Sequence, residues 1–105
     1  MRFIETPIFA KAIDELLDGD DYHALQLALI ARPNLGAVIR GGGGLRKMRW
    51  SRIGTGKRGG LRVIYHWDEP SETFYLLYVY PKSAQDDLTP KQLRVLSRLV
   101  GEEFQ

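Results

Sequence analysis

The residues with the clearest chemical potential are cations in the middle of the chain. Positions 40–66 have eight Lys or Arg residues and no Asp or Glu. These cations are Arg40, Arg46, Lys47, Arg49, Arg52, Lys57, Arg58 and Arg62. The rest of the chain has seven cations and thirteen anions, although the net charge of the whole is only +2. A segregated positive surface attracts polyanions, whereas a basic region that serves only solubility usually mixes the two signs.

A glycine-rich stretch, GTGKRGG at positions 54–60, raises the question of a nucleotide phosphate loop. A dinucleotide fingerprint needs a helix directly after its glycines, whereas the next residues, LRVIYHW, have the composition of a strand. A Walker-type loop needs Ser or Thr after Gly-Lys, and here Arg58 follows Lys57. Neither motif is met, so the stretch is interpreted as a hairpin connection with two cations at its tip.

Strand alternation brings several cations to one side of a sheet. In LRKMRW (45–50), Lys47 and Arg49 point to the face opposite Met48. The next strand allows a register in which Arg62 joins that face, and Lys82 follows the last strand closely enough to lie beside them. Because a sheet core rarely holds unpaired charge, the sequence predicts a cationic pocket formed by Lys47, Arg49, Arg62 and Lys82.

Aromatic residues in the same strands favour a single-stranded nucleic acid as the polyanion, because bases stack on aromatic rings. For each tyrosine the alternative is packing in the core. The residues expected to bind RNA are Arg46, Lys57, Arg58, Tyr65 and Tyr80.

The chemistry open to such a pocket is phosphodiester transfer. Cleavage of RNA needs a deprotonated 2′-hydroxyl, stabilisation of the phosphorane charge and protonation of the leaving 5′-oxygen. Arginines can stabilise the charge. A lysine crowded by like charges loses its proton more readily, so we hypothesise that Lys47 or Lys82 is the general base.

Other catalytic groups are poorly represented. His23 and His66 are not paired at a useful spacing, and the Asp pairs 20–21 and 86–87 are expected at a helix start and in a turn. The chain has no cysteine, which excludes disulfides and thiolate metal sites. We therefore expect a metal-independent reaction without a cofactor.

The elements that position these residues follow from hydrophobic periodicity and turn signals. The predicted order is strand, two helices, three strands and a C-terminal helix, an α+β fold with a small, mainly antiparallel sheet. The predicted strands are 2–6, 45–50, 61–67 and 73–80. The first predicted helix is 8–17, the second is capped by Asp20 or Asp21 and runs toward Arg32, and the third follows Thr89. Thr89 is expected to cap the last helix, with Gln92 as its capping-box partner.

The length of 105 residues fits one domain, 1–105. No window reaches the ~20 apolar residues that a membrane-spanning helix needs, and the first residues do not form a signal peptide. We therefore expect a cytoplasmic protein without a membrane partner.

Several segments together resemble the RelE/ParE superfamily of bacterial type II toxins, and the HigB-like branch in particular. The resemblance covers positions 3–100. It is carried by FIETPIFAKAIDELL (3–17), PNLGAVIRGGGG (33–44), GGLRKMRW (43–50), GKRGGLRVIYHW (56–67) and FYLLYVYPKSAQDDLT (74–89).

The resemblance implies a ribosome-dependent endoribonuclease that cuts mRNA in the A site. The family's basic catalytic positions match Lys47, Arg49 and Arg62, with Lys82 where the family often has Arg or Lys. Some members have a functional tyrosine within the stretch that here reads SAQDDLT and has none, so Tyr80 is the nearest substitute.

The resemblance also implies partners: the ribosome, mRNA and a cognate antitoxin of the helix-turn-helix type, with DNA contacted only through the antitoxin complex. Two other functions remain open. One is a ParE-like inhibitor of DNA gyrase with the same fold, and the other is a non-catalytic RNA-binding module.

Overall fold

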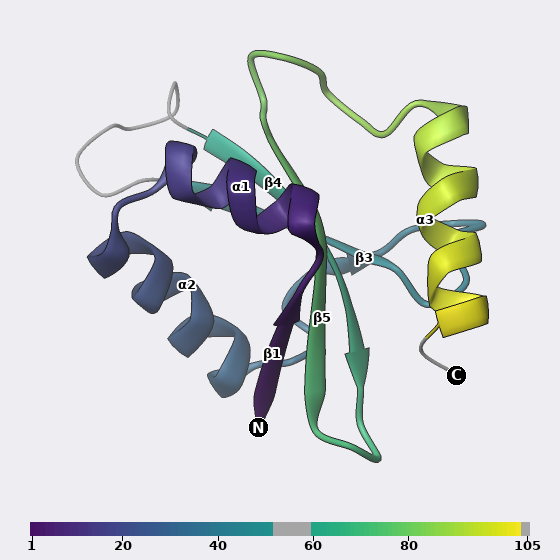
Figure 1. Cartoon of the computed structure of the whole chain (residues 1–105), viewed down its shortest axis with the longest axis horizontal. Helices are drawn as coiled ribbons and strands as arrows, with labels where there is room; N and C mark the ends of the chain where they lie inside the picture. Colours follow the sequence, from purple (N-terminus) through teal and green to yellow (C-terminus); the bar gives the residue numbers. More distant parts are fainter. Residues whose placement is uncertain (52–59, 104–105) are drawn as a thin grey trace.

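A mixed β-sheet with helices on both faces forms the centre of the molecule (Figure 1). The structure is a computed structural model, and it describes residues 1–51 and 60–103. Within them, the strands are β1 (Arg2–Glu5), β2 (Ala37–Val38), β3 (Arg46–Ser51), β4 (Gly60–Asp68) and β5 (Thr73–Pro81). The helices are α1 (Pro7–Leu16), α2 (Gly19–Ala31) and α3 (Pro90–Glu103). The predicted α+β fold is confirmed.

The strand order is β1-β5-β4-β3-β2, with β1 parallel to β5 and the other pairs antiparallel. β5 is therefore an interior strand, as its apolar residues on both faces predict. β2 was not predicted, because two residues are too few to show a period. It pairs with β3 through Ala37 opposite Lys47 and Val38 opposite Arg46, which extends the sheet on the cationic side.

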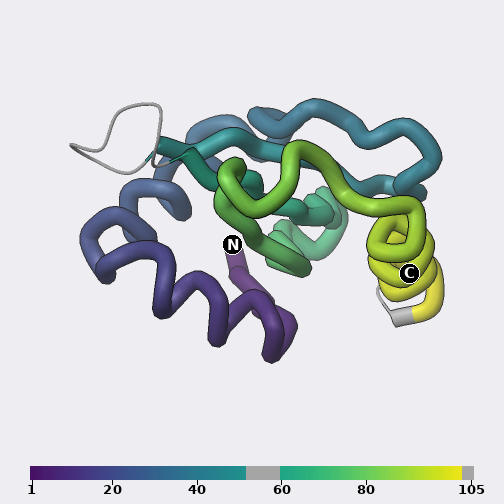
Figure 2. The backbone as a smooth tube through the Cα atoms, turned by 90° about the horizontal axis from the view of Figure 1, so that it is seen from above, coloured from purple at the N-terminus to yellow at the C-terminus, as the bar shows by residue number. Residues whose placement is uncertain are grey.

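Two hydrophobic clusters lie on opposite faces of the sheet. α1 and α2 cover one face, where Phe9 and Leu25 pack in a cluster with Phe74. α3 covers the other face, where Leu96 belongs to a cluster with Ile64. Figure 2 shows α1 and α2 on one side of the molecule and α3 on the other. Because side chains alternate along a strand, β4 and β5 contribute to both clusters.

The helix ends show one prediction confirmed and one wrong. At α3 the Thr89 hydroxyl accepts a hydrogen bond from Gln92 N at 3.1 Å, and Gln92 Oε1 accepts one from Thr89 N at 2.9 Å, which is the predicted capping box. α2 is capped by Asp18, not by Asp20 or Asp21, because the Asp18 carboxylate accepts from Asp21 N at 2.8 Å. None of the described helices is long and apolar enough to cross a membrane.

Candidate active site

The register of β3, β4 and β5 places the predicted cations on one face. Arg49 lies directly opposite Arg62, and Arg62 lies opposite Tyr80 on β5. Lys47 is two residues from Arg49 on β3 and so shares its face. This is the face that α3 covers, because Tyr80 belongs to the α3-side cluster. The three cations from two neighbouring strands are thus side by side.

Lys82 is the first residue after β5, in a turn. Its backbone N–H donates to the carbonyl of Gly60 at 2.9 Å, which keeps the two strands together beyond Pro81. Lys82 is not among the residues that line the groove, so its place beside the other cations stays a prediction. Its side chain is exposed to solvent.

A groove of about 390 Å³ opens beside these cations. It is bounded by β2, the segment after it, β3 and the connection that leads into α3. Its lining residues are Ala37, Val38, Ile39, Arg40, Lys47, Arg49, Asp87, Leu88 and Leu93. Arg62 is only 8% exposed, so it lies beneath the surface next to Arg49. The groove combines cationic side chains with an apolar wall, which suits a phosphate attached to a sugar and a base.

Asp87 is an anion within this cationic set, and the sequence did not reveal its role. Its carboxylate accepts a hydrogen bond from Lys47 Nζ and forms an ion pair with it. This contact with Lys47, and to a lesser degree the charges of Arg62 and Arg49, lowers the pKa of Asp87 below its ordinary value. Among the described cations, Lys47 is the one in direct contact with Asp87. Residue types alone indicated only a turn.

Tyr80 lies in the same place but cannot stack on a base, because only 3% of it is exposed. The stacking predicted for it is therefore wrong in this structure. Its buried hydroxyl has no hydrogen-bond partner among residues 1–51 and 60–103. Burial and then the charge of Asp87 raise the pKa of Tyr80, while Arg62 opposes the shift. The hydroxyl is thus a neutral donor at pH 7.

Two predicted RNA-binding residues, Arg46 and Tyr65, face the other side of the sheet. Tyr65 is fully buried in the cluster beneath α1 and α2, since it alternates with Ile64. Its hydroxyl accepts from Gly36 N and donates to Pro33 O, both at 2.8 Å. Arg46 lies opposite Tyr65, and its guanidinium donates to Gly36 O at 2.8 Å. Both side chains hold the loop after α2. Because Tyr65 is fully buried, the prediction that it binds RNA is wrong, whereas RNA binding by the partly exposed Arg46 stays a prediction.

Tyr65→Phe tests this correction. Removal of the hydroxyl leaves the buried Gly36 N–H and the Pro33 carbonyl without their partner, so we expect a loss of about 1–3 kcal/mol in the free energy of unfolding. Urea denaturation measures the loss. RNA binding of the folded variant should equal that of the wild type, and a large drop in RNA affinity would restore Tyr65 as a contact residue.

The other predicted contacts, Lys57 and Arg58, lie outside the described residues.

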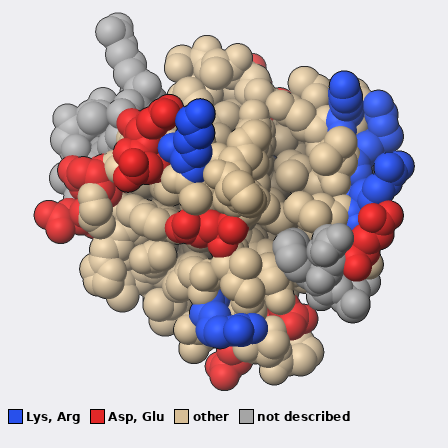
Figure 3. Space-filling model, in the orientation of Figure 1, with Lys and Arg blue, Asp and Glu red and all other residues tan. Residues whose placement is uncertain are grey.

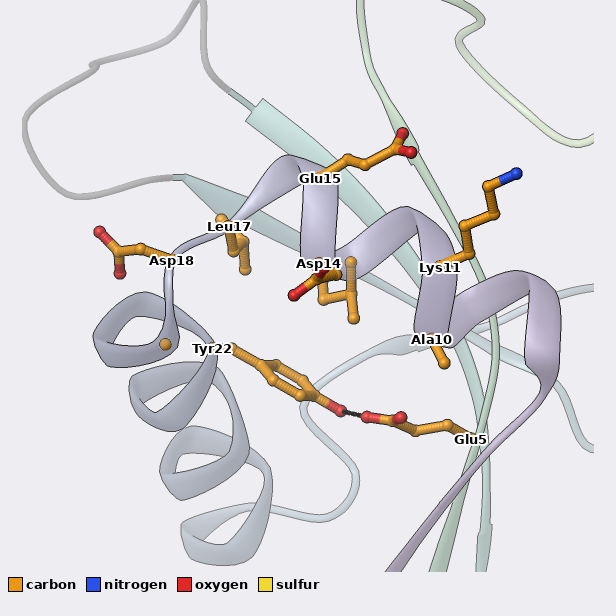
Figure 4. Close-up of a pocket in the computed structure, with 10 residues that line it drawn as sticks. Glu5, Ala10, Lys11, Asp14, Glu15, Leu17, Asp18 and Tyr22 are labelled. Atoms are coloured by element: carbon orange, nitrogen blue, oxygen red, sulfur yellow. Dashed lines mark hydrogen bonds between the residues drawn. The ribbon is translucent and has the colours of Figure 1, made fainter.

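A second groove, of about 470 Å³, lies between β1, α1 and α2. Figure 4 shows the Tyr22 hydroxyl pointing to the Glu5 carboxylate, to which it donates a hydrogen bond. Asp14, Glu15 and Asp18 also line this groove. Figure 3 shows acidic side chains gathered over α1 and α2, with a basic one beside them, and basic side chains over α3, with acidic ones at its lower end. Carboxylates repel phosphate, so this groove is unsuited to RNA.

The fold and the groove define a class: a small α+β protein with a cationic face on its sheet. Among family models, the one described as the RelE toxin of the RelE/RelB toxin–antitoxin system matches residues 27–105. This match covers most of the chain and includes every residue of the cationic face. The chain therefore belongs to the RelE toxin family, and its system includes a cognate antitoxin.

Proposed function

We propose that this toxin is a ribosome-dependent endoribonuclease that inhibits translation by cutting mRNA in the A site. The observation that carries the proposal is the direct pairing of Arg49 with Arg62 on the face that also presents Lys47. Two guanidinium groups on neighbouring strands match the charge and geometry of a phosphodiester. Family membership supports the same reading, because RelE toxins are generally endoribonucleases.

In the proposed reaction the 2′-hydroxyl attacks the adjacent phosphorus in line with the 5′-oxygen. Arg49 and Arg62 bind the non-bridging oxygens and stabilise the charge that develops on the phosphorane. Tyr80 lies opposite Arg62 on the neighbouring strand, but its hydroxyl is buried, so we assign it no direct contact with the phosphate. The bond from phosphorus to the 5′-oxygen then breaks and the leaving oxygen takes a proton from solvent, which gives a cyclic phosphate and a free 5′-hydroxyl.

The structure bears on the choice of general base. Lys47 is held in an ion pair with Asp87, so this contact must open before Lys47 can act on a substrate. Lys82 has no ion pair within residues 1–51 and 60–103. We therefore favour Lys82 as the base and assign Lys47 to binding phosphate.

We propose that the ribosome orients the mRNA, which this small set of catalytic groups cannot do alone. An oriented mRNA in the A site would align the 2′-hydroxyl for attack, and proximity of this kind can supply about 7–11 kcal/mol of barrier reduction. We also propose a cytoplasmic location, membership of the HigB-like branch and an antitoxin of the helix-turn-helix type, which the resemblance of the sequence supports.

The test is primer extension on mRNA in translating ribosomes, with purified toxin. We expect new ends within the A-site codon, bearing 2′,3′-cyclic phosphate and 5′-hydroxyl groups, and about a 100-fold lower rate for Lys82→Ala. Intact mRNA together with inhibited supercoiling in a gyrase assay would instead identify a gyrase inhibitor. RNA binding without either effect would identify a binding module.

A further inference from the structure

Asp87 is an unusual residue for a site that binds phosphate. Its side chain is 72% exposed, yet it forms the only ion pair within the described residues, with Lys47. It lines the same groove as Arg49, and its pKa responds to Arg49 and Arg62 as well. An anion therefore already occupies the groove that Lys47 and Arg49 line.

The backbone around Asp87 is tethered, so the position of its carboxylate is defined. Gln85 Nε2 donates to the Asp87 carbonyl at 2.8 Å and to Gln92 Oε1 at 2.9 Å. Gln92 closes the capping box of α3, and its Nε2 donates to the Tyr78 hydroxyl on β5 at 3.3 Å. The connection from β5 to α3 is thus held at both of the elements that it joins (Figure 1).

We propose that Asp87 is a specificity-determining residue whose carboxylate occupies the position of a substrate phosphate. It is displaced only by an anion that contacts several cations of the groove at once. The inference rests on the proposed function, because it names the anions that the same site admits. An exposed ion pair is weak, so it can be broken by an incoming ligand. A single phosphate would only exchange the ion pair of Lys47 with Asp87 for one of Lys47 with phosphate. An RNA strand would add contacts with Arg49, Arg62 and Lys82.

The test compares Asp87→Asn with Asp86→Asn, a neighbouring exposed carboxylate whose removal changes the net charge equally. The probes are a fluorescein-labelled 2′-O-methyl RNA 12-mer, which cannot be cleaved through a 2′-hydroxyl, and adenosine monophosphate as competitor. We expect Asp87→Asn to bind both probes about fivefold or more tightly, with the larger relative gain for the monophosphate. Asp86→Asn should change either affinity by less than about twofold.

The salt dependence separates competition from a general charge effect. With Asp87 removed, RNA neutralises one more cation, so the slope of log affinity against log salt should steepen by about 0.7. In Asp86→Asn the slope should stay at the wild-type value. Adding Lys47→Ala to Asp87→Asn should abolish the gain, since the carboxylate then has no ammonium to release.

Equal affinities and slopes for Asp87→Asn and Asp86→Asn would overturn the inference, and so would weaker binding by Asp87→Asn. Thermal unfolding of both variants excludes misfolding as the cause. Ribosomal cleavage by the wild type is measured in parallel. If the wild type cuts mRNA and the two Asn variants behave alike, the inference fails alone; if the wild type does not cut, the proposed function fails whatever the binding shows.

Discussion

Arg62→Ala is expected to lower the rate of mRNA cleavage on ribosomes by about 10²- to 10³-fold, the usual effect of removing one donor that stabilises a transition-state anion. Arg62 is 8% exposed and lies opposite Arg49 on the neighbouring strand, so water has little access and cannot take over the role of the missing guanidinium in the variant. Single-turnover primer extension measures the rate. Arg62→Lys should recover only part of it, because an ammonium keeps the charge but lacks the planar fork of donors.

The control for Arg62 is Arg98→Ala on the exposed surface of α3, which removes the same charge far along the helix from the groove. It should cleave at the wild-type rate. Because Arg62 is buried, both variants are compared by circular dichroism before the assay. A folded Arg62→Ala protein that cleaves as fast as Arg98→Ala would remove Arg62 from the mechanism.

Phe74→Ala should cause the largest loss of stability, about 3–5 kcal/mol in the free energy of unfolding. Phe74 is fully buried and central to an aromatic group, with ring centroids 4.3 Å from Trp67, 4.9 Å from Phe3 and 6.2 Å from Tyr65. Small domains are stable by only about 5–15 kcal/mol, so the variant should lie close to unfolding. Urea denaturation with fluorescence detection measures the loss.

Val95→Ala is the matched control for Phe74, because Val95 is 58% exposed on α3. Its effect should stay within about 0.5 kcal/mol. If Phe74→Ala costs less than about 1 kcal/mol, the aromatic group does not hold β1, β4 and β5 together as the structure indicates.

The order of the longer elements and the face shared by Lys47 and Arg49 could be predicted because both follow from short-range patterns. The sequence only allowed a register that brings Arg62 to this face, and it did not reveal β2. Period-two alternation fixes which residues of a strand share a face, and so placed Lys47 with Arg49. Alternation does not say which residues of the chosen face are covered. Tyr80 was therefore assigned to stacking, although α3 and its loop bury it.

Other features could not be predicted because they depend on long-range contacts. Tyr65 lies beside a bulge, where Leu77 of β5 is the extra residue, and its hydroxyl bonds to a loop far back in the chain. The contact between Lys47 and Asp87 joins residues forty positions apart. It depends on the path of the connection into α3, which the residue types SAQDDLT do not specify.

The position of β5 has a consequence for the cell that makes this protein. β5 is the strand that joins β1 to β4, through pairs such as Phe3 with Phe74 and Arg62 with Tyr80. During synthesis a chain emerges from its first residue onward, so β1, β3 and β4 leave the ribosome before the strand that unites them. The unfinished polypeptide therefore lacks the strand that pairs with Arg62, so the sheet that carries Arg49 and Arg62 is completed only after β5 has been synthesised.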